Sequence, residues 1–506
     1  MVAKVHAATL VGIEAVPIVV EVDTKGAQNS EFIIVGLPDQ AVSESKTRVR
    51  SAIQNSSLSL PGLLIICNLA PGDVRKEGPA LDLPIAVAVL AATAQVPASE
   101  LEDTLILGEL GLDGNVRSID GAVSYALMAA EKGVKRLILP QESALEAAVA
   151  QGVEVYGVET LVDVVSLLNG STLHRPIVFE HPGLEVTHSA YEVDFQDVKG
   201  QKQAARALEI AAAGGHNVLM VGPPGSGKTM LARRLPTILP PLTLEESIEV
   251  TRIYSSAGQH RGRQGLIWER PFRPPHHSAS HAAVVGGGKF PKPGEVSLSH
   301  KGVLFMDEMA EFDRQVLEAL RQPLEDGVVT VSRVQASLTF PAECMLIGAM
   351  NPCPCGFKGL PEQSCVSNPN VCGKYANKIS GPLLDRIDLH IQVPRLKPEE
   401  LLNAPEGEAS AAIRERVIRA RERQHARLGP PKLNAKMGPR EIRELIQLDA
   451  ESTDFMRQIL ARMNLSARVF DRVLKVARTI ADLAGSENVQ KNHLSEAVQY
   501  RERAEF

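Results

Sequence analysis

The chain has few aromatic residues and few cysteines, and it has no excess of positive charge. Aromatic side chains make up 4% of its 506 residues, so its cores must be built mainly from Ala, Val, Leu and Ile. The formal net charge of −6 gives no general attraction to nucleic acid, so a basic binding site must be local. Six cysteines in a chain of this length do not indicate a disulfide scaffold.

Apolar segments long enough to cross a membrane are also missing. The longest uncharged run, residues 83–99, contains two prolines and predicts a buried helix. Residues 1–6 lack the apolar core and the cleavage site of a signal peptide. These absences lead us to expect a cytoplasmic protein with no membrane partner.

Length alone predicts about three domains, and changes in the residue pattern place them. Residues 1–170 alternate strand and helix patterns, as in an α/β or α+β domain. Residues 171–195 have weak periodicity and are interpreted as a linker. Residues 196–396 alternate buried strands with helices, as in a nucleotide-binding sheet, and residues 397–506 have an entirely helical pattern.

A glycine-rich sequence between a buried strand and a helix carries the clearest functional signal. Its spacing, G-x-x-x-x-G-K-[ST], predicts a backbone cradle for the phosphates of ATP. In this pattern Lys228 reaches the β- and γ-phosphates, and the Thr229 hydroxyl binds Mg²⁺. A glycine-rich turn without a ligand is the alternative that the flanking strand and helix disfavour. The predicted nucleotide-binding residues are Gly222, Pro223, Pro224, Gly225, Ser226, Gly227, Lys228 and Thr229.

Polar side chains follow two further buried strands. Asp307 comes after the apolar residues 303–306, where it can hold Mg²⁺, and Glu308 is placed to act as the general base. Asn351 follows the apolar residues 345–350, where an amide can orient water against the γ-phosphate. Two solvated acids and a turn-forming Asn are the simpler alternatives. The order of cradle, acid strand and polar-tipped strand matches the AAA+ ATPases.

Two arginines resemble AAA+ residues that act on ATP. Arg386, flanked by apolar residues before a strand, resembles the arginine finger that reaches the ATP of a neighbouring subunit. A salt bridge to Asp385 or Asp388 is its structural alternative. Arg468, in the first turn of an amphipathic helix with Ser466 as a plausible N-cap, resembles the sensor arginine of the lid.

Between the cradle and the acid strand lies a rarer pattern. Residues 270–280 read R-P-F-R-P-P-H-H-S-A-S, and residues 351–356 read N-P-C-P-C-G. With these motifs the whole chain resembles the magnesium-chelatase-like AAA+ proteins and, among them, the ComM/YifB family. The resemblance implies an α/β fold with an AAA+ P-loop core and parallel sheet, a helical lid similar to the magnesium-chelatase C-terminal domain, use of ATP and Mg²⁺, and a homo-hexameric ring.

The family also implies an insert in the second ATPase helix and a hairpin before the polar-tipped strand. Residues 327–332 and 336–340 are the expected hairpin strands, with Arg333 at the tip. In related helicases a basic residue at that tip touches DNA. Lys289 and Lys292 are candidates for a second DNA-contacting element. From the residues alone, an ordinary solvated hairpin is equally favoured.

Metal ligands are suggested at two places. The cysteines Cys353, Cys355, Cys365 and Cys372 favour zinc over disulfides in a cytosolic protein. Their spacing departs from the family, in which the second pair lies closer together, so zinc and four reduced thiols stay equally open. For His276, His277 and His281, a structural or inter-subunit role is favoured over a metal site.

Residues 1–170 resemble the Lon-protease-like (ribosomal S5 domain 2-like) domain that begins ComM/YifB proteins. Lon proteases use a Ser–Lys dyad, but here Ala80 stands at the serine position and residues 119–123 contain no lysine. Without a nucleophile or its base, peptide hydrolysis has no agent. We therefore expect a retained fold without protease chemistry.

The resemblance implies an ATP-driven motor on single-stranded or branched DNA, a helicase or branch-migration factor in natural transformation. Arginines crowd residues 414–427, although the interleaved Glu415 and Glu422 make a solvated helix almost equally plausible. A magnesium-chelatase-type subunit that remodels a protein or a porphyrin-metallating partner is the alternative. A protease lacks its dyad, and a scaffold would not need a complete ATPase set.

Overall fold

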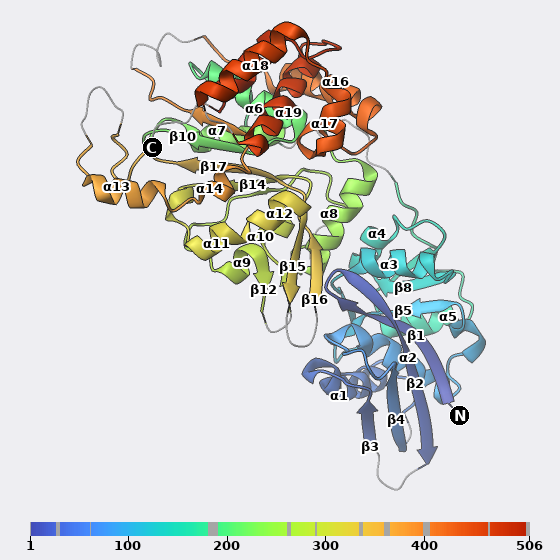
Figure 1. Cartoon of the computed structure of the whole chain (residues 1–506). Helices are drawn as coiled ribbons and strands as arrows, with labels where there is room; N and C mark the ends of the chain where they lie inside the picture. Colours follow the sequence, from blue (N-terminus) through green and yellow to red (C-terminus); the bar gives the residue numbers. More distant parts are fainter. Residues whose placement is uncertain are drawn as a thin grey trace. The chain divides into compact units, whose positions relative to one another are not determined.

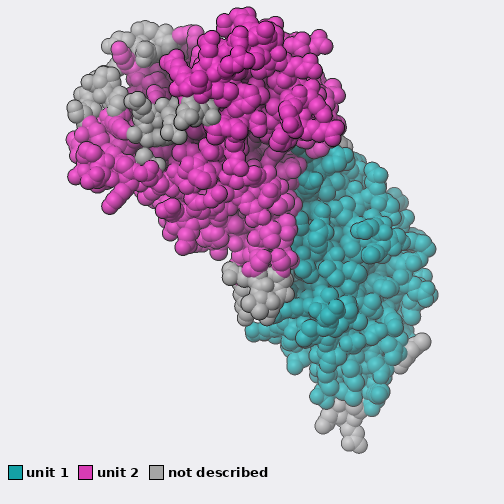
Figure 2. Space-filling view, in the orientation of Figure 1, with its two compact units in different colours: residues 1–182, 244–267 teal, residues 183–243, 268–506 magenta. Residues whose placement is uncertain are grey.

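The computed structural model describes residues 2–26, 31–60, 62–180, 191–260, 265–288, 291–332, 337–358, 365–397, 405–463 and 466–501 (Figure 1). The chain forms two compact units, one of residues 1–182 and 244–267 and the other of residues 183–243 and 268–506 (Figure 2). Residues 244–267 fall within the predicted ATPase core of residues 196–396, but they group with the first unit. Among the described helices, none is long and apolar enough to cross a membrane.

The first unit is built on a seven-stranded mixed sheet with the order β3-β4-β2-β1-β5-β8-β9. The long hairpin of its first two strands is antiparallel, and the strands from β5 onward are parallel. The strands are β1 (Val2–Val11), β2 (Glu14–Gly26), β3 (Glu31–Val35), β4 (Leu63–Ala70), β5 (Thr104–Ile106), β8 (Arg136–Pro140) and β9 (Glu154–Val158), and β6 (Glu109–Leu110) pairs with β7 (Val116–Arg117).

The helices of the first unit include the one expected from the long uncharged run. Helix α2 (Asp82–Ala92) is buried along nearly all of its length, because it packs against β1 and β2 with an apolar surface on every side. The other helices are α1 (Gln40–Asn55), α3 (Ala122–Glu131), α4 (Gln141–Ala147), α5 (Leu161–Leu168) and α8 (Leu244–Ser256). The Lon-like assignment of this unit stays a prediction.

A buried polar network binds α8 to the first unit. Ser255 accepts a hydrogen bond from the backbone N–H of Gly121 at 2.7 Å and donates one to Glu146 at 2.9 Å. Glu146 also accepts from the backbone N–H of Ala122 at 3.1 Å, and burial raises its pKa to about 7. Helix α8 thus belongs to the first unit although its chain neighbours on both sides belong to the second.

The second unit contains a five-stranded sheet with the order β11-β14-β17-β10-β18, and all its strands are parallel. Its three central strands are buried on both faces, as expected for a parallel sheet covered by helices. The strands are β10 (Val218–Val221), β11 (Phe272–Arg273), β14 (Val303–Met306), β17 (Met345–Met350) and β18 (Leu389–Gln392). Strand β17 lies between β10 and β14, so their carboxyl ends meet at one edge.

Two short hairpins project from this core. Strands β15 (Val328–Ser332) and β16 (Ser337–Pro341) pair in antiparallel register, as do β12 (Gly286–Gly287) and β13 (Lys292–Pro293). Because β12 contacts β15, the two hairpins lie side by side (Figure 1). The expected hairpin is therefore present, with strand limits shifted by one residue. Arg333 and Lys289 lie outside the described residues, and Lys292 is exposed on β13.

One group of helices surrounds the sheet and a second group forms the C-terminal part, which confirms the expected α/β class and helical C-terminal region. The former are α6 (Lys202–Gly214), α7 (Lys228–Ile238), α9 (His281–Val285), α10 (Glu295–Leu298), α11 (Arg314–Ala319), α12 (Arg321–Asp326), α13 (Pro369–Ala376) and α14 (Gly381–Leu384). The latter are α16 (Ser410–Leu428), α17 (Pro439–Leu445), α18 (Ala450–Met463), α19 (Ala467–Leu483) and α20 (Lys491–Gln499).

Most of the arginines of α16 serve packing within the second unit. Arg416 pairs with Glu209 of α6 at 2.6 Å, and Arg427 pairs with Asp482 of α19 at 2.7 Å. Arg421 donates to the Ala212 carbonyl of α6 at 2.6 Å. These contacts join the helical region to the core, so this arginine-rich stretch gives little support for DNA binding.

Asp388, immediately before β18, is a buried ionic link between the core and α19. It pairs with Arg472, accepts a hydrogen bond from the Asn217 backbone at 3.0 Å and faces the His216 ring at 3.5 Å. Burial alone would raise the pKa of Asp388, but Arg472 and then His216 outweigh burial and hold that pKa well below its usual range. The ionised carboxylate therefore stabilises the fold.

We expect Asp388→Asn to lower the free energy of unfolding by about 3 kcal/mol at neutral pH, because Arg472 loses its charged partner. A carboxylate with a depressed pKa contributes stability above about pH 4, and this contribution is lost as the pH falls further. The free energy of unfolding of the variant should therefore fall less between neutral and acidic pH than that of wild type. Urea unfolding at pH 7 and pH 3.5 measures both effects. Asp385→Asn, a half-exposed neighbour, is the matched control, and equal stabilities of the two variants would contradict the account.

Candidate active site

The loop between β10 and α7 has the backbone of a phosphate cradle. Gly225 and Gly227 adopt left-handed conformations, with φ of +75° and +89°, which side chains disfavour. Helix α7 begins at Lys228, directly after the loop, so its first backbone N–H groups face the loop. Free N–H groups at a helix N-terminus are suited to binding an anion.

Lys228 lies buried beneath the loop. Its ammonium donates to the carbonyls of Gly222 at 2.7 Å and Pro223 at 2.9 Å, and lies 3.4 Å from Oδ1 of Asn351. Burial lowers the pKa of Lys228, and the nearby Asp307 and Glu308 partly oppose this shift. The amine can thus exchange loop carbonyls for phosphate oxygens without leaving the site.

The predicted Mg²⁺ ligands are in direct contact. The Thr229 hydroxyl, in the first turn of α7, donates to Oδ2 of Asp307 at 2.7 Å. Asp307 follows β14 and is half-buried, whereas the next residue, Glu308, is exposed. A hydroxyl and a carboxylate are hard oxygen ligands of the kind that Mg²⁺ takes beside a phosphate. The structure therefore brings the predicted metal ligands together across 78 residues of sequence.

Glu308 has a strained backbone. Its φ of +49° lies in the left-handed region, which is uncommon for residues other than glycine and costs of order 1 kcal/mol. The same residue donates its backbone N–H to Oδ1 of Asp307 at 2.9 Å. Such strain is concentrated at functional sites, and here the two consecutive acids have different side-chain partners, Thr229 for Asp307 and His277 for Glu308.

The Pro-Pro-His-His segment lies against these acids. A cavity of about 240 Å³ is lined by Thr229, Arg233, Pro274, Pro275, His276, His277, Phe305, Asp307 and Glu308. Nδ1 of His277 is 3.4 Å from Oε2 of Glu308. His281 lines a different cavity, so the three histidines do not form one metal site. The sequence pattern marked the histidines as unusual, but it did not show that His277 lies beside Glu308.

Arg386 is paired with another acid, Glu325, and Arg468 lines a cavity with the same residue. Arg386 forms a salt bridge with Glu325 and donates to the Pro382 carbonyl at 2.9 Å, so its acidic partner is Glu325 and not Asp385 or Asp388, the partners of the structural alternative. The Arg386 hydrogen bond, followed by the charges of Arg468 and Arg472, holds the pKa of Glu325 below its usual range.

The two arginines line cavities away from the cradle. Arg386 lines one of about 550 Å³ together with His281 and Glu325. Arg468 lines one of about 370 Å³ that also contains Lys436 and Arg472. Among the described residues, neither Arg386 nor Arg468 lines the cavity that contains Thr229 and Glu308.

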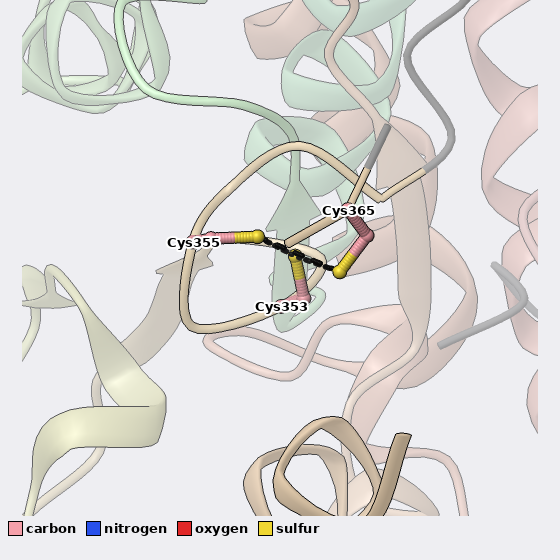
Figure 3. Close-up of side chains that lie close together, drawn as sticks. All are labelled: Cys353, Cys355 and Cys365. Atoms are coloured by element: carbon pink, nitrogen blue, oxygen red, sulfur yellow. Dashed lines mark hydrogen bonds between the residues drawn. The ribbon is translucent and has the colours of Figure 1, made fainter. Parts of the chain in front are cut away.

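The predicted cysteine cluster is formed after β17. The sulfur of Cys355 lies 3.3 Å from that of Cys353 and 3.5 Å from that of Cys365, and the three point toward one another (Figure 3). The sulfur of Cys372 lies 3.7 Å from that of Cys365. All four are free thiols.

Profiles of known families match three consecutive parts of the chain. "Subunit ChlI of Mg-chelatase" matches residues 20–143, and "Magnesium chelatase, subunit ChlI" matches residues 194–401. "Magnesium chelatase, subunit ChlI C-terminal" matches residues 407–501. The middle match contains the cradle and the acids Asp307 and Glu308. It also contains the segment with the four cysteines, residues 353–372, which we call the cysteine loop.

Relatives match over almost the full length. "Uncharacterized protein YifB" of Salmonella typhimurium is 44% identical, with 99% of this chain and 97% of the relative covered. "Competence protein ComM" of Haemophilus influenzae is 43% identical over the same shares. "Magnesium-chelatase 67 kDa subunit" of Chlorobaculum tepidum is 30% identical over 32% of this chain and 23% of its own length. The chain therefore belongs to the ComM/YifB family of magnesium-chelatase-like AAA+ ATPases.

Proposed function

We propose that the second unit hydrolyses ATP at the cradle, with Lys228 on the β- and γ-phosphates and Mg²⁺ held by Thr229 and Asp307. Glu308 is the general base, and Asn351 orients the attacking water. One observation carries this proposal: the contacts of Thr229 with Asp307 and of Lys228 with Asn351 converge from three separate strand ends on one edge of the sheet. Membership of a magnesium-chelatase-like ATPase family supports the use of ATP and Mg²⁺.

The active form that we propose is a homo-hexameric ring. AAA+ membership supports oligomeric assembly. In the ring, Arg386 would stabilise charge on the ATP of the neighbouring subunit, and Arg468 would act from the helical lid. Arg386 does not line the cavity beside its own cradle, which favours its action across a subunit boundary, and its salt bridge to Glu325 would hold it until a neighbour docks.

The substrate that we propose is single-stranded or branched DNA, moved in the cytoplasm by ATP-driven cycles. The two adjacent hairpins support this proposal, since together they present one projecting element for the pore of a ring. Arg333, Lys289 and Lys292 are the proposed DNA contacts. A relative named as a competence protein supports helicase or branch-migration work in natural transformation.

The alternative is a magnesium-chelatase-type subunit that remodels a protein or a porphyrin-metallating partner. The names of the matching family profiles favour it. The partial match to the 67 kDa chelatase subunit, which covers 23% of that protein, favours it less than the full-length matches favour the DNA motor. The first unit, which we propose to be Lon-like without its dyad, would be a platform or a DNA guide in either case.

The DNA proposal predicts that Arg333→Ala weakens binding of single-stranded DNA about tenfold in the presence of a non-hydrolysable ATP analogue. Loss of one phosphate contact should also reduce the slope of log binding constant against log salt concentration by about 1. Fluorescence anisotropy at several salt concentrations measures both. Arg440→Ala, which removes an exposed arginine paired with Glu444 within α17, is the control. Equal losses in both variants would contradict a specific contact.

A further inference from the structure

Three sulfurs, those of Cys353, Cys355 and Cys365, lie close enough together to hold one metal ion, and Cys372 approaches this group through Cys365. Besides the two shortest distances, the sulfurs of Cys353 and Cys365 lie 3.7 Å apart, as do those of Cys365 and Cys372. A tetrahedral zinc ion with Zn–S bonds of about 2.3 Å requires sulfurs about 3.8 Å apart. A disulfide would require about 2.05 Å, which no pair of these thiols approaches.

The chemistry of the ligand set also fits zinc. Four thiolates are soft ligands that form closed, structural Zn²⁺ sites, with no open position for a substrate. The backbone N–H of Lys358 donates to the sulfur of Cys353 at 3.3 Å, the kind of outer contact that orients a metal ligand. Zinc bound here would supply structural cross-linking and no catalytic chemistry.

The same loop packs closely against the phosphate cradle. Gly356, one residue after the second cysteine, has a φ of +79°, and a Cβ atom there would lie 2.5 Å from Cδ of Pro224. The cradle is also hydrogen-bonded to the end of β17, just before this loop, because Gly222 donates its N–H to the Met350 carbonyl at 3.2 Å. Only a glycine lets the cysteine loop approach the cradle this closely.

The cysteines are also joined to the proposed site through the polar-tipped strand. Asn351 follows β17, and Cys353 comes two residues later. The side chain of Asn351 lies 3.4 Å from the ammonium of Lys228. The first cysteine is therefore only two residues from a side chain of the proposed ATP site.

We infer that the four cysteines bind one structural zinc ion that clamps this loop against the phosphate cradle, so that nucleotide affinity depends on the metal. The inference rests on the proposed ATP site. With zinc, the loop is held at both ends and Pro224 and Asn351 stay in place. Without zinc, the thiol cluster no longer fixes Gly356 or α13, and ordering the cradle costs part of the binding free energy of ATP.

Two pairs of variants of the full-length protein test the clamp. Cys355→Ser/Cys365→Ser removes two ligands, and Cys344→Ser, a free cysteine just before β17, is its control. Gly356→Ala adds a methyl group against Pro224 without removing a thiol. Its control is Gly373→Ala on α13, where an added Cβ meets nothing within 4 Å. Zinc content by elemental analysis and affinity for a fluorescent ATP analogue are measured for each.

We expect one zinc ion per wild-type chain, lost in the double serine variant together with at least a tenfold loss of ATP affinity. Gly356→Ala should keep its zinc and bind ATP several-fold more weakly, and both controls should match wild type. Wild-type protein purified without zinc under reducing conditions, or a zinc-free variant with normal ATP affinity, would overturn the clamp.

The clamp can fail separately from the ATP site. If wild type holds zinc but does not bind the nucleotide, the proposed ATPase function is wrong and the metal site remains. If the double serine variant does not fold, Gly356→Ala still decides the matter, because unchanged nucleotide affinity in that variant contradicts a clamp.

Discussion

Glu308→Gln is expected to lower ATP turnover about 10²–10⁴-fold, because the amide cannot accept the proton of the attacking water. ATP affinity should stay close to that of wild type, since Lys228, Thr229 and the cradle are unchanged. The variant should therefore hold ATP with Mg²⁺ and fail to release phosphate. Phosphate release and equilibrium binding of a fluorescent ATP analogue separate these two effects.

Glu311→Gln is the matched control for that experiment. Glu311 is exposed in the turn after Glu308 and pairs with Lys378 at 3.4 Å, so the same change of charge occurs one turn away from the proposed base. Its turnover should remain within about twofold of wild type, as for most surface substitutions. Comparable losses in both variants would mean that negative charge, and not the base at residue 308, supports turnover.

Arg386→Ala is expected to reduce ATP turnover about 10³-fold or more, the usual effect of removing an arginine finger. In the structure Arg386 forms a salt bridge with Glu325, so this salt bridge must break before Arg386 can reach the ATP of a neighbouring subunit. Phosphate release by assembled rings measures the loss. Arg395→Ala, which removes an exposed arginine after β18, is the control and should leave turnover near wild type.

Mixed rings distinguish action on a neighbour from a structural role. Rings containing Glu308→Gln and Arg386→Ala subunits in equal numbers should recover roughly a quarter of wild-type turnover, because random association pairs an intact base with an intact neighbouring arginine at that frequency. Each variant alone should be nearly inactive. Doubly tagged mixed rings that show no recovery would contradict the role of Arg386 in a neighbouring site.

Local sequence predicted the cradle because its chemistry lies in consecutive residues. The spacing of Gly222, Gly227 and Lys228 dictates the loop, and the structure has the expected strand, left-handed glycines and helix. The alternation of buried strands and helices predicted a nucleotide-binding sheet, and the resemblance to AAA+ proteins implied that its strands are parallel. Because parallel strands end together, such a sheet places Asp307 and Asn351 at one edge.

Other contacts could not be predicted, because they depend on residues far apart in sequence. Nothing local indicates that Glu325 pairs with Arg386 across 61 residues, or that His277 lies 3.4 Å from Glu308. Helix α8 lies inside residues 196–396, the predicted ATPase core, whereas Ser255 hydrogen-bonds within the first unit. An amphipathic pattern predicts a buried face without identifying its partner.

The most direct test of the central claim is the ATP turnover of wild-type protein with and without single-stranded and forked DNA. The account predicts strong stimulation by DNA that is absent in Glu308→Gln and weakened in Arg333→Ala. Turnover that is abolished by Glu308→Gln but indifferent to every DNA tested would contradict the DNA motor, and it would direct attention to a porphyrin-metallating or protein partner.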